Sequence, residues 1–107
     1  MPFIAICHDQ DSADSAALRE THLRAHFDYI EGILDRLLVA GPAGGKTNDG
    51  KANDEWAFSV FIYATDDRDD AERLLHADPY YRCGLYGEVT IEPFVPAAGA
   101  WIGGKVW

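Results

Sequence analysis

A stripe of apolar side chains between Leu23 and Leu37 constrains the fold of this chain more than any other feature. Its members are Leu23, Phe27, Ile30, Leu34 and Leu37, separated by steps of four, three, four and three residues. Such steps follow one face of an α-helix, and charged residues occupy the other side of the same segment. Asp14 or Ser15 is placed to cap the start of the helix. The sequence therefore predicts an amphipathic helix that buries this stripe.

Four β-prone segments flank this helix and a later one. They are residues 3–8, 37–40, 56–64 and 86–94. The third segment combines aromatic and β-branched residues, which favour a strand. The second is expected to close at Gly41-Pro42. In the last segment, Val89 and Ile91 point to one face of a sheet and the polar residues beside them point to the other.

A second, shorter helix is predicted after the third strand. Residues 65–70 are rich in aspartate, and acidic side chains are favourable at the positive end of a helix dipole. The helix continues through the apolar residues Ala71, Leu74 and Leu75. Pro79 disfavours helical geometry at Asp78, so the helix is expected to end near Ala77.

The resulting order is strand, helix, strand, strand, helix, strand. This is the order of the ferredoxin-like fold in the α+β class, a four-stranded antiparallel sheet with two helices on one face. The opposite face of such a sheet is bare, and a second copy of the chain is the simplest cover for it. The sequence therefore predicts a homodimer.

One domain is expected to span residues 1–107, with a core at 1–95 and an apolar tail at 96–107, because the chain is too short for a second core. The tail carries Trp101, Ile102, Val106 and Trp107. These side chains are too apolar to stay in solvent, so the tail is expected to pack on the partner or over the site. Residues 43–55 are expected to form a mobile loop. Within it, residues 44–47 (Gly-Gly-Lys-Thr) lack the full spacing of a phosphate-binding loop and indicate a turn.

The charge of the chain excludes two classes of partner. Acidic residues outnumber basic ones by 18 to 9, which gives a formal net charge of −9. Phosphate binding needs clustered lysines and arginines, so a nucleic-acid partner is not expected. The same excess argues against attachment to an anionic membrane. A small anionic substrate stays open, because a few local arginines can outweigh the overall charge.

The cysteines and the N-terminus indicate a cytoplasmic protein. Cys7 and Cys83 lie far apart and lack the spacing of a metal site, and Cys7 falls in an apolar run typical of a core residue. The apolar run at residues 3–7 has no basic residues before it and is followed at once by acids, unlike a signal peptide. We therefore expect a reducing compartment and no required disulfide.

Several short motifs give the chain a resemblance to a known family. They are Arg19, Arg24 and His26 on the first helix, the run 38–42 (Leu-Val-Ala-Gly-Pro), Ser59, the run 78–80 (Asp-Pro-Tyr), the pair 84–85 (Gly-Leu) and the run 92–94 (Glu-Pro-Phe). Together these resemble the YCII-related family over nearly the whole chain. The tail after Phe94 departs from the family pattern.

The resemblance implies a fold and an activity. Proteins of this family are small and ferredoxin-like, and they pair into a dimeric α/β barrel. Their active site is taken to be a His–Asp pair, and one branch acts as a dehydrochlorinase on a chlorinated hydroquinone. Carried over to this chain, the histidine is His26 and the acid is Asp78. His22 also precedes a leucine and is the alternative position for the family histidine.

Helical phase separates the two histidines. At 100° per residue, His26 lies about 60° from the direction of Leu23, and His22 lies about 100° away. His26 is thus expected at the border between core and solvent, as a site residue or as a half-buried packing histidine. His22 is expected at the surface. A metal site formed by both is disfavoured, because the glutamate of a zinc-protease motif is absent between them. No metal is expected.

Other candidate site residues also have ordinary structural explanations. Asp78 is a candidate helix stop whose carboxylate bonds nearby backbone N–H groups. Ser59 is either a plain strand residue or a hydroxyl that reaches the cavity beside His26. Arg19 is the more suitable anion contact of the first helix, although surface pairs with acids are the alternative. Tyr80 is a candidate pocket-lining residue, whereas Trp56 and Tyr81 are chiefly packing residues.

Three classes of function remain open from the sequence. The leading hypothesis is a cofactor-independent enzyme for a small aromatic or lactone-like molecule, in which His26 transfers a proton and Asp78 orients it. Elimination, as in a dehydrochlorinase, or isomerisation suits such a pair because neither needs an electron carrier. The alternative is a non-catalytic dimeric module that binds a metabolite or a protein. The third class is haem or other oxidative chemistry on the same barrel.

Overall fold

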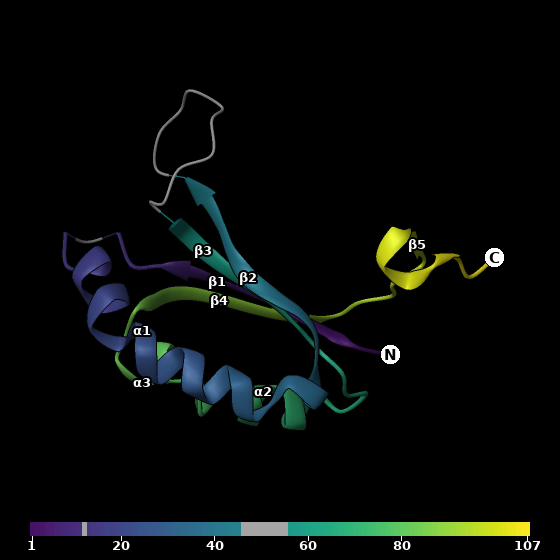
Figure 1. Ribbon diagram of the computed structural model, residues 1–107, viewed down its shortest axis with the longest axis horizontal. Helices are drawn as coiled ribbons and strands as arrows, with labels where there is room; N and C mark the ends of the chain where they lie inside the picture. The colour runs from purple at the N-terminus through teal and green to yellow at the C-terminus, as the bar shows by residue number, and fades with distance from the viewer. Residues whose placement is uncertain (12, 46–55) are drawn as a thin grey trace.

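A four-stranded sheet with helices on one face organises the chain in the computed structural model, which describes residues 1–11, 13–45 and 56–107 (Figure 1). The helices are α1 (Ser15–Gly32), α2 (Arg68–His76) and α3 (Pro79–Arg82), with two 3-10 turns, η1 (Leu34–Arg36) and η2 (Ala100–Ile102). The strands are β1 (Phe3–Asp9), β2 (Leu37–Gly45), β3 (Trp56–Tyr63), β4 (Tyr86–Pro93), β5 (Ala98–Gly99) and β6 (Gly104–Lys105).

The main sheet has the ferredoxin-like strand order. Its order is β2-β3-β1-β4, and every neighbouring pair is antiparallel. Each of the two strand–helix–strand units therefore brackets a strand from the other unit, as the split arrangement requires. This confirms the predicted fold class. Among the described residues, no helix combines the length and the apolar character that a membrane crossing requires.

Strand alternation divides the sheet into a covered face and an open face. In β1, Phe3, Ala5 and Cys7 are buried under the helices, whereas the intervening residues face the other way. Cys7 pairs with Ser59 on one side and with Val89 on the other, so these residues share the covered face. The core on this face is Phe3, Ala5, Cys7, Phe61, Tyr63, Ala71, Leu75, Tyr80, Leu85 and Tyr86.

The second strand is longer than predicted. It passes through Gly41 and Pro42 and ends at Gly45, so the expected closure at Gly41-Pro42 is wrong. Proline removes one hydrogen-bond donor, which an edge strand tolerates, and β2 lies at the edge of the sheet. The predicted loop at 43–55 therefore loses its first three residues to the strand. Residues 46–55, including Lys46 and Thr47 of the expected turn, lie outside the described part of the chain.

The first helix is rotated relative to the predicted stripe. Leu23, Phe27 and Leu34 are 42%, 47% and 63% exposed in the single chain. Ile30 and Leu37 pack on the core as the stripe predicts, and Leu18 and Ile33, which lie outside the stripe, pack there as well. Other inward positions of α1 are taken by Arg19 and His26, which have polar partners on other elements. Apolar periodicity alone misplaced part of the buried face, because two of its positions are polar.

The second helix begins and ends close to where the sequence predicts. Asp67 caps it by accepting a hydrogen bond from the backbone of Asp69 at 3.0 Å, and the helix ends at His76 with Ala77 as its C-cap. The sequence did not predict the short helix α3 that follows at once. Asp78 caps α3 and Pro79 is its first residue, a position where proline costs no hydrogen bond. The chain therefore turns sharply at Asp78 and fixes its carboxylate in the interior.

The C-terminal tail forms a small hairpin of β5 and β6 that projects away from the sheet and the helices (Figure 1). Its Trp101 is 88% exposed, and Val106 and Trp107 are exposed as well. The single chain therefore leaves the apolar side chains of the tail uncovered.

Truncating the core at Leu75 should destabilise the fold. Leu75 is fully buried where α2 meets the sheet, so Leu75→Ala loses apolar burial and leaves a cavity. We expect its free energy of unfolding to fall by about 2–5 kcal/mol in urea titrations. Leu34→Ala is the matched control at an exposed position and should change it by less than about 0.5 kcal/mol. Equal losses in the two variants would contradict the assignment of the core.

Candidate functional site

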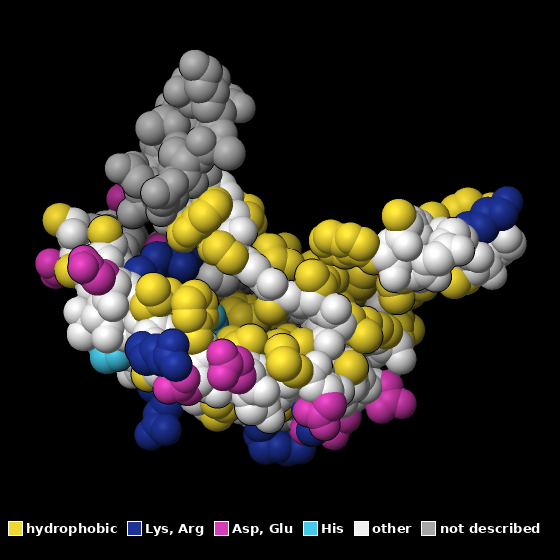
Figure 2. Space-filling model, viewed as in Figure 1, with side chains coloured by type: hydrophobic (Ala, Val, Ile, Leu, Met, Phe, Trp, Pro, Cys, Tyr) yellow, Lys and Arg dark blue, Asp and Glu magenta, His cyan; other side chains and the backbone are white. Residues whose placement is uncertain are grey.

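A cavity of about 620 Å³ lies between α1 and the covered face of the sheet. Leu23, Phe27 and Ile30 of α1 form one apolar wall, and Trp56 and Phe61 of β3 contribute to the opposite one. Figure 2 shows hydrophobic side chains gathered around the hollow above α1. Among the described lining residues, the polar ones are few: Arg19, Glu20, His26, Ser59 and Tyr80.

His26 contacts Asp78 at the inner wall of this cavity. The Nδ1 atom of His26 lies 2.8 Å from Oδ1 of Asp78, although the residues are 52 positions apart in the sequence. The backbone N–H of Tyr80 donates a second hydrogen bond to the same carboxylate oxygen at 2.9 Å. With the carboxylate ionised, Nδ1 carries a proton and donates it, which leaves Nε2 as the free nitrogen. The structure thus brings together the two residues that the sequence proposed as a pair.

Two aromatic rings hold the imidazole in place. The ring of Tyr80 stacks on His26 with centroids 4.0 Å apart and an interplanar angle of 12°. Phe61 meets it edge-on at 6.3 Å. The Tyr80 hydroxyl in turn donates to the backbone carbonyl of Arg19 at 3.2 Å. The imidazole is therefore restrained by a hydrogen bond at one edge and by ring contacts.

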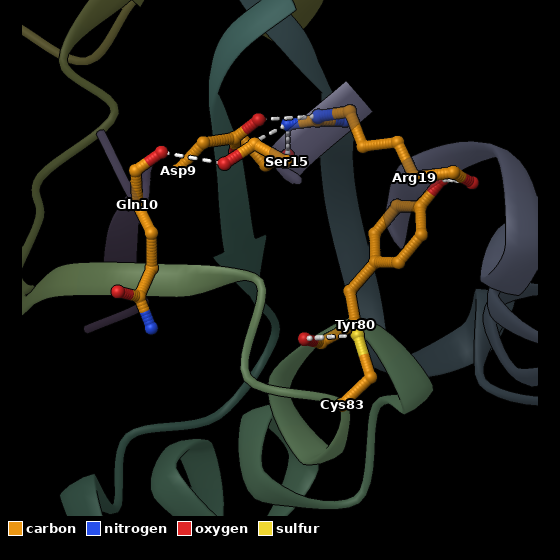
Figure 3. A network of polar contacts seen from close by, with 7 residues as sticks. Asp9, Gln10, Ser15, Arg19, Tyr80 and Cys83 are labelled. Carbon is orange, nitrogen blue, oxygen red and sulfur yellow. Dashed lines mark hydrogen bonds and ion pairs between the residues drawn. The ribbon is translucent and has the colours of Figure 1, made fainter. Parts of the chain in front are cut away.

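Arg19 forms a second ion pair across the cavity wall (Figure 3). Its Nε and Nη2 atoms donate to the two carboxylate oxygens of Asp9 at 2.6 and 2.8 Å, and Nη2 also donates to the Ser59 hydroxyl at 3.1 Å. The guanidinium carbon lies 5.4 Å from the centre of the Tyr80 ring. Burial alone would lower the pKa of Arg19, but Asp9 outweighs it and raises the pKa above its ordinary value.

The thiol of Cys7 and the phenol of Tyr86, behind this wall, are held in their neutral forms. Burial raises the pKa of Cys7 to about 12, with further contributions from the charges of Asp78 and Asp9. Burial also raises the pKa of Tyr86, a shift that Ser59 opposes and Asp78 reinforces. A thiol and a phenol of this kind stay protonated near neutral pH, so neither is a base or a nucleophile here.

The second oxygen of Asp78 is a costly feature of this wall. Oδ2 is buried and has no hydrogen-bond partner among the described residues. A buried acceptor without a partner lowers the free energy of unfolding by about 1–3 kcal/mol. Its presence in a folded protein therefore calls for an explanation other than stability.

The remaining predicted residues fall in different places. His22 lines a separate hollow with Ala77 and Pro79, away from the cavity. Arg24 forms an exposed pair with Asp28 at 3.4 Å, as expected for a surface arginine. No tail residue lines the cavity among those described, so the expected position over the site is not adopted within one chain.

Two aromatic residues that the sequence assigns chiefly to packing take different positions. Trp56 lines the cavity. Tyr81 packs against the core and stacks on His76 with ring centroids 4.4 Å apart.

Asp9 is the site residue that the sequence analysis missed. The first strand is predicted to end at residue 8, yet Asp9 is the last residue of β1. Phe3, Ala5, Cys7 and Asp9 are alternate residues of that strand, and the first three are buried under the helices. Period-two alternation carried one step further would have placed Asp9 beside Cys7 on the covered face.

Removing the Asp78 carboxylate should destabilise the protein. Asp78→Ala leaves the Tyr80 N–H and the His26 Nδ1–H without an acceptor, and we expect the free energy of unfolding to fall by about 2–4 kcal/mol. Asp78→Asn retains an oxygen that can accept both bonds, so its loss should be smaller. Asp28→Ala, which removes the exposed partner of Arg24, should leave the unfolding midpoint in urea nearly unchanged. An Asp78→Ala variant as stable as Asp28→Ala would contradict this geometry.

Comparison with known proteins agrees with the fold. The model of the YCII-related domain matches residues 1–95. The proteins named YciI of Escherichia coli O6:H1 and of Shigella flexneri are each 30% identical to this chain over 91 residues, which are 83% of this chain and 93% of each relative.

A solved structure of similar fold is the 5-chloro-2-hydroxyhydroquinone dehydrochlorinase TftG of Burkholderia phenoliruptrix, in complex with 2,5-dihydroxybenzoquinone. It superposes with a TM-score of 0.77 at 22% sequence identity, over 94% of this chain and 97% of that one. The sequence matches and the shared fold lead to one conclusion: this chain belongs to the YCII-related family.

Proposed function

We propose that this protein is an enzyme that moves a proton on a small molecule without a cofactor, in an elimination or an isomerisation. The observation that carries the proposal is the 2.8 Å contact between Nδ1 of His26 and the buried carboxylate of Asp78 at the wall of a cavity. In this proposal His26 is the catalytic base and acid, and Asp78 is its positioning residue.

The pair supplies the parts of a general base. Asp78 fixes the tautomer in which Nε2 carries the lone pair, and its charge stabilises the imidazolium that forms when Nε2 takes a proton. The C–H or O–H bond of the substrate breaks, an N–H bond forms at Nε2, and the electron pair moves into the substrate. Loss of a leaving group completes an elimination, whereas return of the proton at another atom completes an isomerisation.

The cavity suits a small, largely apolar substrate. Its volume of about 620 Å³ is within the range of small-molecule pockets, and most of its lining is apolar or aromatic. Arg19, Ser59 and Tyr80 are the polar groups that would orient such a substrate beside His26. The cavity thus combines an apolar enclosure with a few fixed donors, which is the usual composition of a binding site.

The reaction type is taken from a protein of the same fold. TftG carries the name of a dehydrochlorinase and was solved with a dihydroxybenzoquinone. Dehydrochlorination removes a proton and a chloride, and a histidine base can carry out the first of these steps. We extend that reaction type to this chain as part of the proposal.

Substitution of His26 is the direct test of the proposal. With 5-chloro-2-hydroxyhydroquinone and unchlorinated hydroxyquinones in deuterated buffer, chloride release and deuterium uptake at carbon measure the proton transfer. We expect His26→Asn to lower the rate by about 100-fold or more, because it removes the base. Asp78→Asn should also lower it, because it no longer fixes the tautomer. His22→Asn, on the same helix but outside the cavity, should stay within about twofold of the unsubstituted protein.

Two outcomes would overturn the enzymatic proposal. A His26→Asn variant with unchanged rates would remove His26 from the chemistry. Binding of these compounds to the unsubstituted protein without chloride release or deuterium uptake would instead favour the non-catalytic binding module.

We further propose that two copies of the chain pair through the open face of the sheet. Ile4 and Ile6 of β1 and Val60 and Ile62 of β3 lie on this face, opposite the helices, and are only partly buried in one chain. The exposed tail at 96–107 would then pack on the partner. Association of apolar faces removes them from water, which favours a homodimer. The free Cys7 and Cys83 suit a reducing compartment, and we place the dimer in the cytoplasm.

A charge on the open face should separate the copies. Val60→Asp places a carboxylate on the face that the dimer would bury, and burial of an unpaired charge opposes association. Light scattering coupled to gel filtration should give twice the chain mass for the unsubstituted protein and the mass of one chain for the variant. Thr21→Asp, the same charge at an exposed position on α1, should stay dimeric. An unsubstituted protein that elutes as a monomer would contradict the pairing.

A further inference from the structure

We infer that the cavity selects an uncharged ring compound over its carboxylate counterpart, and that Arg19 serves as a charge-balanced hydrogen-bond donor rather than as an anion anchor. This inference rests on the proposed function of the His26–Asp78 pair and names the substrate class of the same site. The sequence alone allows a small anionic substrate, whereas the charges around the cavity disfavour one.

The positive charge of Arg19 is already compensated by the protein. Asp9 binds it through two nearly parallel hydrogen bonds of 2.6 and 2.8 Å, the bidentate arrangement in which a guanidinium and a carboxylate interact most strongly. The side chains of Arg19 and Asp9 are only 13% and 3% exposed, so solvent screens the pair little. An incoming carboxylate would therefore meet a neutral pair and would compete with Asp9 for the same cation.

The other charges near the cavity also disfavour an anion. Among the described lining residues, Arg19 is the only one with a permanent positive charge, whereas Glu20 lines the cavity and Asp78 lies directly behind His26. The chain as a whole carries a formal charge of −9. A carboxylate brought close to these acidic side chains is repelled at short range, and the negative charge of the whole chain repels it at longer range.

Arg19 and Ser59 keep the capacity to bind a neutral oxygen. Nε and Nη2 of Arg19 make the bonds to Asp9 and Ser59, and Nη1 takes part in none of these. Because Ser59 accepts from Arg19, its hydroxyl hydrogen is directed away from the guanidinium. His26 and Arg19 both lie against the ring of Tyr80 and both line the cavity, so the two are available to a ligand bound there.

This arrangement assigns a role to Arg19 during proton transfer. When a C–H bond next to a carbonyl breaks and the proton moves to Nε2 of His26, the electron pair delocalises onto the carbonyl oxygen. When an O–H bond breaks instead, the pair stays on the oxygen that loses the proton. That oxygen is neutral in the bound substrate and gains charge only as the reaction proceeds. A hydrogen bond from these donors strengthens as charge develops on that oxygen, which favours the transition state. A carboxylate is charged before it enters and has to lose its hydration on binding, a cost that the neutral substrate avoids.

A pair of ligands that differ by one charge tests the selection. The probes are 2,5-dihydroxybenzamide and 2,5-dihydroxybenzoate, which share a ring, two hydroxyls and nearly the same size. Binding to the unsubstituted protein is measured by ligand-observed NMR and calorimetry, at low and at high salt. We expect the amide to bind at least about tenfold more tightly, with little dependence on salt. Tighter binding of the carboxylate, or no binding of the amide at millimolar concentration, would overturn the inference.

Asp9→Asn supplies the matched variant, because it removes the compensating charge and keeps the shape. The preference for the amide should shrink or reverse, since Arg19 then offers an unpaired positive charge. A folded variant with an unchanged preference would show that Asp9 does not set it. If Asp9→Asn fails to fold, the comparison in the unsubstituted protein still decides. Because these measurements involve no turnover, their failure is distinct from a failure of His26→Asn to slow the reaction.

Discussion

The buried carboxylate of Asp78 is the constraint on which the site depends. It is placed by the abrupt change from α2 to α3, where Asp78 caps the short helix and Pro79 begins it. One of its oxygens then accepts from both the backbone of Tyr80 and the ring of His26. Burial of a carboxylate destabilises a fold unless the group is paired and hydrogen-bonded, and Asp78 is fully buried. The turn between α2 and α3 therefore depends on His26 of α1 as a partner for its carboxylate, and His26 depends on that carboxylate for its orientation. The carboxylate thereby joins two halves of the chain.

Asp78 combines two roles that the sequence suggests for it. The sequence allows this acid both to bond nearby backbone N–H groups and to orient a histidine, and one oxygen makes both contacts. A capping bond fixes the position of the carboxylate more rigidly than a flexible side chain on a surface would allow. The capping bond therefore holds the carboxylate in the position from which it orients the imidazole. The structural role of Asp78 thus supports the functional role that we propose for it.

The sequence predicted the order of the elements better than the orientation of the first helix. Local patterns predict two features that the structure shows. One is the alternation of Val89 and Ile91 with polar residues in β4, and the other is the end of α2 near Ala77. The face of α1 does not follow from local pattern, because Arg19 and His26 occupy inward positions that apolar periodicity assigns to leucine or phenylalanine. Their partners are Asp9 and Asp78, on elements far away in the sequence. Only the tertiary fold shows that polar residues at these positions are compensated.

The polar residues at inward positions of α1 also explain why a cavity lies between this helix and the sheet. An apolar helix face would interdigitate with the sheet and fill the space between them. Here α1 is linked to the rest of the fold by directed bonds: Arg19 to Asp9, His26 to Asp78, and the Tyr29 hydroxyl to the carbonyl of Leu74 at 2.6 Å. Directed bonds fix distances between atoms, and the wall that they form leaves the apolar residues Leu23 and Phe27 to line a hollow rather than a packed core. The pairs that create the proposed chemistry therefore also create the space in which a substrate would bind.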